Sequence, residues 1–299
     1  MEHHLQKAWA DEAVENAYFQ RIEAMVQAGD LDAASAIIEE DLASVDTPLG
    51  QLCRDLSEEA VDIAGWEELG DSIAQYEGEP ITAVHIMISN EPDLVFEDKS
   101  ITHHPMIEVM FYSDEHLAFS EMARDEILAA SLTEDESWWG QGEDMEAYLE
   151  INGLSQLNTA LLHHKRQYYF RDQMHVLDEA NGLASDTAPL LYIEFRLASM
   201  LRAVRYHQAV KALVEGFGLR KNVPVLVGMH NMKPEISSVY MAKSAVIVEM
   251  ARIPKLAVTI KRNMEEIPEE VSGSTLRQRV LVETEEEKPG FFRRLFGRR

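Results

Sequence analysis

The chain has 299 residues, which is enough for one large domain or two of ordinary size, and 46% of them are hydrophobic, as in a protein with a packed core. Its formal net charge of −26 repels nucleic acid, so we expect no nucleic-acid partner. The single cysteine, Cys53, excludes an intramolecular disulfide, and neither a signal-peptide pattern nor an apolar run as long as a membrane span occurs, so we expect a cytoplasmic protein.

The first part of the chain, residues 1–78, is predicted to form a helical hairpin region. Apolar residues recur at helical spacing over residues 2–28, and the pattern resumes over residues 31–45 after a Gly-Asp break. A Thr-Pro-Leu-Gly turn at residues 47–50 precedes a third predicted helix, which ends near Ala64.

The next part, residues 79–264, is predicted to be an α/β body. Residues 81–89 and 106–112 are rich in β-branched and apolar side chains and are bounded by turn residues, which predicts two strands. Asp114 suits the N-cap of a helix over residues 115–132. The body therefore begins as a mixture of strands and helices.

The remainder of the body continues this mixture. A strand is predicted at residues 147–151, a helix at 155–170, and the longest helix from residue 185 or 186 to residue 216 or 218. Further strands are predicted at residues 224–229, 245–250 and 256–260. The expected fold class is α+β, with an N-terminal helical region followed by one or two mixed α/β units.

Two stretches of the body share an order of residues that suggests a duplication, with related units at 79–170 and 171–264. In each stretch a strand is followed by Asn, Pro, an acidic residue, Lys-Ser and a second strand. The matched positions are Asn90, Pro92, Lys99 and Ser100 in the first unit, and Asn231, Pro234, Lys243 and Ser244 in the second. The gaps between them differ by a few residues, so a chance likeness stays open beside the duplication.

Two arginines and two histidines are the candidates for a ligand site. Arg202 and Arg205 are three residues apart, which places them on one helix face that could bind a phosphate or carboxylate. The alternative is that they neutralise part of an acidic body. His103 and His230 stand near the ends of predicted strands. No motif for a metal site or a known reaction accompanies them, so we expect a non-enzymatic protein without metal or cofactor.

A second candidate surface is an adjacent pair of tryptophans, Trp138 and Trp139, in the acidic segment 133–146. Tryptophan is common among the residues that dominate protein interfaces, so the pair could anchor a protein partner. It could equally cover the chain's own hydrophobic core.

The last twelve residues, 288–299, differ from the rest of the chain. In a helix, their apolar side chains fall within one arc and their arginines lie on the other side. The apolar residues are Phe291, Phe292, Leu295 and Phe296. The basic residues are Lys288, Arg293, Arg294, Arg298 and Arg299. A short helix with an aromatic face and a basic face is typical of a segment that lies in a membrane interface.

Charge is unevenly divided between this tail and the remainder of the chain. The tail holds five basic residues and no acidic residue, which leaves 22 basic against 53 acidic groups in residues 1–287, a net charge of −31. Such a body is repelled by anionic lipid, so attraction to a membrane has to come from the tail. The acidic segment 265–287 is predicted to be a flexible tether between them.

The carboxyl-terminal sequence EEEKPGFFRRLFGRR, residues 285–299, resembles the MinD-type membrane-targeting sequence of bacterial cell-division ATPases. Both have an acidic run, Lys, Gly, two apolar residues, two basic residues and Leu-Phe-Gly in that order. The resemblance covers about fifteen residues, and the sequence contains no Gly-rich loop ending in Lys-Ser or Lys-Thr. It therefore implies a shared membrane address and no ATPase activity.

The function expected from these features is that of a non-enzymatic peripheral membrane adaptor or regulator at the cytoplasmic face of a bacterial inner membrane. Its partners would be an anionic membrane surface and, because one tail binds weakly, a protein partner or further copies of the chain. One alternative is an uncharacterised enzyme or a domain that binds a small ligand or anion. Another is a soluble interaction module whose tail docks on a partner.

Overall fold

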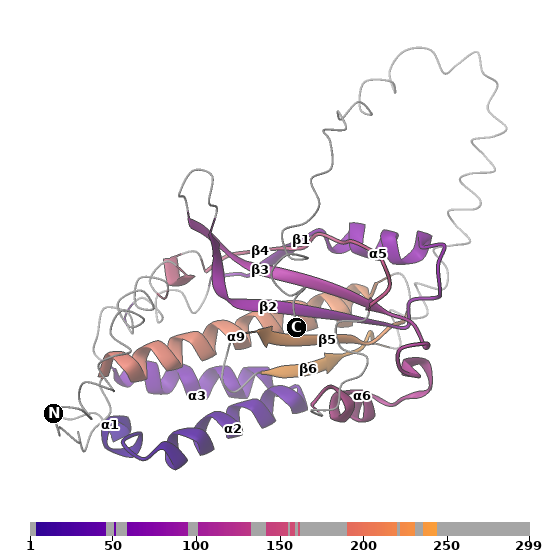
Figure 1. The fold of residues 1–299 in the computed structure, drawn as a ribbon. Coiled ribbons are helices and arrows are strands. Elements are labelled where there is room, and N and C mark those ends of the chain that lie inside the picture. The colour runs from indigo at the N-terminus through magenta and orange to yellow at the C-terminus, as the bar shows by residue number, and fades with distance from the viewer. Residues whose placement is uncertain are drawn as a thin grey trace, which may run out of the picture. The chain divides into compact units, whose positions relative to one another are not determined.

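The computed structural model describes residues 4–45, 51, 59–94, 101–132, 142–154, 156–158, 161, 190–219, 222–230 and 236–243. All of them belong to the first of two compact units, Met1–Met250. Within this unit, a four-stranded sheet lies beside long helices (Figure 1), and the α+β fold class predicted from the sequence is confirmed. The domain boundaries after residues 78 and 264 stay predictions.

The chain begins with three helices, namely α1 (His4–Ala8), α2 (Glu12–Ala28) and α3 (Leu31–Ser44). The helix predicted over residues 2–28 is interrupted, because Asp11 is extended and its side chain accepts a hydrogen bond from the Ala13 N–H at 2.9 Å, as an N-cap does. Gly29 ends α2 with φ of 82°, a conformation that suits glycine. The helix predicted over residues 31–45 is confirmed as α3.

Three short elements lie together on another part of the molecule, namely β1 (Asp62–Ala64), α5 (Trp66–Gln75) and β4 (Glu150–Asn152). The prediction of a helix up to Ala64 is wrong over residues 59–64, where β1 pairs antiparallel with β4. Ile63 and Ile151 lie directly opposite each other and are both buried, so a distant partner decides the local structure. The strand predicted at residues 147–151 overlaps β4.

The main sheet has four strands, namely β2 (Ala83–Leu94), β3 (Ile101–Tyr112), β5 (Val225–His230) and β6 (Ser237–Tyr240). Their spatial order is β3-β2-β5-β6. The two inner strands, β2 and β5, run parallel, and each outer strand pairs antiparallel with its inner neighbour. The sheet thus consists of two hairpins joined along a parallel pair.

Most of this sheet agrees with the sequence analysis. The strands predicted at residues 81–89, 106–112 and 224–229 correspond to β2, β3 and β5. No strand was expected where β6 lies, because its Ser-Ser start weakens the apolar pattern and its pairing with β5 decides its conformation. The strands predicted at residues 245–250 and 256–260 lie outside the described residues.

The sheet has a different hydrophobic core on each face, because side chains alternate along a strand. One face supplies the apolar side chains of Val84, Ile86, Ile88, Val225, Val227 and Met229 to a cluster that continues into α2, α3 and α9. The other face packs Ala83, Tyr112, Leu226 and Val239 against Phe119, Ile127 and Leu128.

The helix predicted over residues 115–132 is present in two pieces, η1 (Phe119–Glu121) and α6 (Arg124–Ser131). Asp114 does accept a backbone hydrogen bond, from the N–H of Ser120 at 3.0 Å, but this bond closes a loop before η1. Glu126 accepts from the Ala123 N–H at 2.6 Å, which caps α6 from within its own first turn. These two side-chain hydrogen bonds therefore divide the predicted single helix into η1 and α6.

The longest described helix, α9 (Leu190–Phe217), confirms the predicted long helix over this range. It ends at Gly218, whose φ is 63°, and the Gly218 carbonyl accepts a hydrogen bond from Trp66 Nε1 at 3.0 Å. The predicted start at residue 185 or 186 lies outside the described residues, as does most of the helix predicted at 155–170.

The parallel pair β2 and β5 brings together strands from both of the units suggested by the internal likeness. Ser89 lies opposite His230 in this pair, one residue before the matched positions Asn90 and Asn231. The two predicted units therefore share one sheet, and their common origin stays a prediction.

Candidate functional site

The two arginines predicted to bind an anion differ in their surroundings. Arg202 is buried, and its Nη1 donates a hydrogen bond to Asn158 Oδ1 at 3.1 Å. The same oxygen accepts from the Tyr206 hydroxyl at 3.1 Å. Burial lowers the pKa of the Arg202 guanidinium. This arginine belongs to a polar cluster inside the core.

Arg205 lies one turn further along α9 and is half-buried. Its Nη2 donates to the backbone oxygen of Glu59 at 2.9 Å, and its Nη1 donates to Gln208 Oε1 at 3.4 Å. Arg205 thus ties α9 to the segment before β1. The two arginines do not form one exposed basic face, and anion binding by them stays a prediction.

The two candidate histidines lie on different strands of the main sheet. His230 is the last residue of β5, opposite Ser89 of β2. His103 lies on β3, in the outer part of its hairpin with β2, between Ile101, which pairs with Leu94, and Pro105, which pairs with Pro92. The register therefore places His103 beyond the level of His230 along the sheet.

A group of polar residues lies on the face of the sheet that carries Ala83 and Leu226. His85 and Ser89 of β2 are both buried and, being four residues apart, lie on the same face. Gly228 of β5 pairs with Met87, between these two residues, and an added Cβ at Gly228 would lie 3.4 Å from His85 Nε2 and 3.5 Å from Ser237 Oγ. The absence of a side chain at Gly228 thus brings groups from three adjacent strands close together.

Electrostatics keep the imidazole of this group uncharged near neutral pH. Burial lowers the pKa of His85 to about 4, because the charged form would lose its hydration. A neutral imidazole has one nitrogen that donates and one that accepts a hydrogen bond. The group thus combines an uncharged imidazole with two serine hydroxyls, which are groups that both donate and accept hydrogen bonds.

The position of this group differs from that of the usual binding sites in open α/β sheets, where ligands bind beyond the carboxyl ends of the strands. His85 and Gly228 lie inside the parallel pair, and β2 continues beyond this pair to Leu94. Sequence reasoning identified His230 and missed His85, Ser89 and Ser237. The alternation of ITAVHIMIS already placed His85 and Ser89 on one face, but the parallel neighbour β5 could not be inferred from it.

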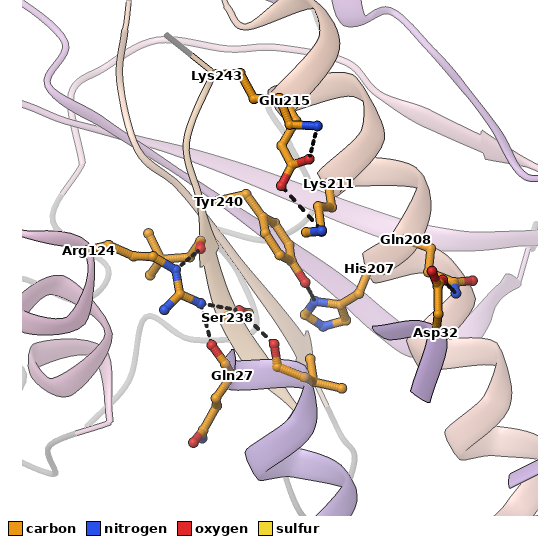
Figure 2. A network of polar contacts seen from close by, with 12 residues as sticks. Gln27, Asp32, Arg124, His207, Gln208, Lys211, Glu215, Ser238, Tyr240 and Lys243 are labelled. Carbon is orange, nitrogen blue, oxygen red and sulfur yellow. Dashed lines mark hydrogen bonds and ion pairs between the residues drawn. The ribbon is translucent and has the colours of Figure 1, made fainter. Parts of the chain in front are cut away.

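A separate polar network joins α2, α6, α9 and β6 (Figure 2). Arg124 of α6 donates from Nε to the Val239 backbone oxygen at 2.8 Å and from Nη2 to Ser238 Oγ at 3.3 Å. Its Nη2 also donates to the backbone oxygen of Gln27 near the C-terminus of α2. The cation thereby satisfies carbonyls of the β6 strand and of a helix end, where a positive charge is favourable.

The same network contains a buried histidine, His207 of α9 (Figure 2). Its Nδ1 lies 2.8 Å from the Tyr240 hydroxyl, and its Nε2 lies 3.3 Å from the Ile236 backbone oxygen. A backbone oxygen only accepts, so Nε2 carries the proton and Tyr240 donates to Nδ1. Burial lowers the pKa of His207 to about 4, which keeps this arrangement neutral.

Glu215 completes the network at the C-terminal end of α9 (Figure 2). Lys243 Nζ lies 2.9 Å from Glu215 Oε2, and Lys211 Nζ lies 3.3 Å from Oε1. Burial by itself would raise the pKa of Glu215, but the two lysines outweigh it and lower the pKa. These contacts hold α9 against the chain that follows β6, so the network is structural.

The remaining site predictions fall on residues outside the described part of the chain, namely Trp138, Trp139 and the tail. Among the described residues, no three His, Cys, Asp or Glu side chains are grouped so that they could hold a metal ion. No helix in the described ranges is long and apolar enough to cross a membrane. Comparison with protein families, curated proteins and solved structures finds no match to this chain.

Proposed function

We propose that this chain is a non-enzymatic peripheral membrane adaptor or regulator, held reversibly at the inner face of the cell membrane by residues 288–299. The observation that supports this most strongly is the separation of charge along the sequence. Five basic residues and no acidic residue lie in the tail, against a net charge of −31 in residues 1–287. The tail combines the positive charge and the apolar side chains that an anionic membrane attracts.

The expected affinity of one tail is low. Each basic residue near anionic lipid contributes roughly 1 kcal/mol, and each of the four apolar side chains adds about 1 kcal/mol if it is half buried in lipid. Ordering about ten residues costs about 1 kcal/mol for each. The favourable and unfavourable terms nearly cancel, so one tail alone binds weakly and reversibly, and stable attachment needs several tails acting together or a membrane partner.

Sedimentation with liposomes tests this function. The full chain is expected to sediment with vesicles that contain anionic lipid at low salt, and a chain ending at residue 287 is expected to remain in the supernatant. Replacing Phe291 and Phe292 with serine should weaken binding at every salt concentration, because insertion is lost. Replacing Arg293 and Arg294 with glutamine should weaken it most at low salt, because the charge attraction is screened at high salt.

Vesicles of zwitterionic lipid alone provide the control for charge, and the full chain should bind them weakly. Equal sedimentation of the full chain and the chain ending at residue 287 would contradict the proposed function. Binding that survives both tail replacements would contradict it as well.

A second candidate function is the binding of a small polar ligand on the face of the β2–β5 pair that carries His85. The observation that favours it is that His85, Gly228 and Ser237, from three adjacent strands, lie close together, with Ser89 further along the same face of β2. This function would add a ligand-dependent step to an adaptor or replace the adaptor role with that of a ligand-binding domain.

The replacement Gly228→Val tests this second function. The Cβ alone would lie at ordinary contact distances from His85 and Ser237, so the two extra methyl groups are expected to press into both and lower the free energy of unfolding by about 1–3 kcal/mol. Gly216→Val is the matched control, because nothing lies within 4 Å of a Cβ at that position. A thermal-shift screen with uncharged, carboxylated and phosphorylated small molecules is the measurement.

A compound that binds beside Gly228 should raise the melting temperature of the original chain and of the Gly216→Val control, but not that of Gly228→Val. A compound that stabilises all three equally binds elsewhere. That result, or a screen in which no compound stabilises the original chain, would count against the second function.

A further inference from the structure

The two most exposed large hydrophobic side chains among the described residues belong to segments that contact the same dipeptide, Gly65-Trp66. Tyr148 is 81% exposed and Phe217 is 69% exposed. The backbone oxygen of Tyr148 abuts Gly65, where an added Cβ would lie only 2.3 Å from it. The next residue, Trp66, donates its indole N–H to the carbonyl of Gly218, which follows Phe217. Two segments from distant parts of the sequence, each with an exposed aromatic residue, thus contact the Gly65-Trp66 dipeptide through their backbones.

The segments that carry these contacts are unusually acidic. Residues 59–79, which form β1 and α5, contain seven acidic residues, and residues 142–154, which contain β4, contain four. Neither segment contains a lysine, arginine or histidine. Several of the carboxylates nearest the dipeptide are exposed, among them Asp62, Glu67, Glu68 and Glu146. We call these two segments together with Phe217 the acidic aromatic surface.

The outer face of the small β1–β4 sheet belongs to the same surface. Asp62 and Ala64 are exposed, whereas Ile63 between them is buried in the core. Exposed aromatic side chains beside carboxylates are the features that a protein partner uses, because aromatic residues supply most of the binding energy and charges set partner choice. An anionic membrane would be repelled by this surface, which excludes lipid as its occupant.

We propose that the acidic aromatic surface binds a basic segment of a partner protein, in which Lys or Arg residues alternate with apolar side chains. The apolar side chains of that segment pack on Tyr148 and Phe217, and its cations face the carboxylates of residues 59–79 and 142–154. The proposal rests on the adaptor function only in where the partner is bound. The tail would hold the chain at the membrane, and this surface would recruit the partner there.

Fluorescence anisotropy on the full chain tests the proposal. The probe is a labelled peptide that repeats Lys-Phe-Arg-Leu three times, and the comparison peptide has serine at every apolar position. The double replacement Tyr148→Ser and Phe217→Ser leaves the net charge unchanged and is expected to weaken probe binding at least about tenfold. The matched control replaces Val14 and Leu132, the other two exposed large hydrophobics in the described residues, with serine and should change affinity less than about twofold.

A charge test follows the same design. Replacing Glu67 and Glu68 with glutamine should weaken binding more than replacing Glu115 and Glu121, which are exposed near η1. Equal affinity for the two peptides, or equal losses in test and control variants, would show that the probe senses only the overall negative charge and would overturn the proposal. The chain's own tail could also occupy this surface and compete with the probe. If a chain ending at residue 287 binds the probe at least tenfold more tightly than the full chain does, the tail is the occupant and the proposal is overturned.

Liposome sedimentation of the same variants separates this proposal from the proposed function. The variant lacking both aromatic side chains should sediment with anionic vesicles as the original chain does, because its tail is intact. Loss of probe binding with retained liposome binding supports the recruitment surface, whereas a chain that binds the probe and never sediments contradicts only the membrane role.

Discussion

Replacing Arg124 with leucine is expected to lower the free energy of unfolding by about 2–3 kcal/mol, because hydrogen bonds from a charged group are worth about 1.5–3 kcal/mol each and two carbonyls lose their donor. The affected groups are the backbone oxygens of Val239 and Gln27 and the hydroxyl of Ser238. Part of the loss is recovered by water, since the Arg124 side chain is 30% exposed. Urea denaturation followed by circular dichroism measures the change.

Two comparison variants show whether geometry or charge accounts for the effect. Arg124→Lys keeps the charge but has one ammonium group in place of the planar fork, so it should recover about half of the lost stability. Arg21→Leu removes an exposed arginine from the middle of α2 and should change stability by less than about 0.5 kcal/mol. A loss for Arg124→Leu no larger than that for Arg21→Leu would show that the contacts to β6 and α2 do not stabilise the fold.

Local sequence was sufficient for the elements whose patterns are strong. The helix α3 shows regular helical spacing and β5 is a short run of apolar residues, so both were predicted nearly to their ends. The strand predicted at residues 81–89 matches the first part of β2, which continues to Leu94. The break before Glu12 could have been predicted too, because Asp11 is a favoured N-cap residue.

Elements that depend on a distant partner were not predictable in this way. The β1 strand has three residues and is extended because Ile63 pairs with Ile151, far along the sequence. The β6 strand starts with two serines and exists through its pairing with β5 and the contacts of Arg124. In both cases tertiary contacts outweigh a weak local preference.

The same reason limits how much of the candidate site the sequence revealed. A spacing of three residues predicted that Arg202 and Arg205 share a helix face, but it could not show that Arg202 is turned into the core. His85 was one histidine among several until the parallel pairing placed it beside Gly228 and Ser237. Charge and amphipathicity in residues 288–299, by contrast, are properties of the sequence itself, which is why the proposed function rests on them.

The stability of the fold is expected to fall by about 3 kcal/mol between pH 7.5 and pH 5.5 through two buried histidines, His85 and His207. Burial lowers the pKa of each from about 6.5 to about 4, so in this range the unfolded chain binds protons that the folded chain excludes. Stability is therefore present above the unfolded pKa and is lost as the pH falls toward the folded pKa. At one unit below the unfolded pKa, each histidine accounts for about 1.4 kcal/mol.

The acidic composition acts in the opposite direction, because protonation of carboxylates reduces the self-repulsion of a chain whose net charge is −26. The histidine contribution is isolated by comparing variants that share this background. His85→Gln and His207→Gln should each lower stability at pH 7.5, and each should make the decline toward pH 5.5 shallower by about 1.4 kcal/mol.

The double variant, with both histidines replaced by glutamine, shows whether the two histidines contribute independently to the pH dependence of stability. His85 lies on β2 and His207 on α9, and their surroundings differ, since the first lies beside Gly228 and the second is hydrogen-bonded to Tyr240. Their effects on the pH dependence should therefore add to about 2.8 kcal/mol in urea denaturation at the two pH values. If the free energy of unfolding of the double variant falls as much between the two pH values as that of the original chain, other groups cause the acid sensitivity. The buried, neutral imidazoles would then contribute nothing to the pH dependence.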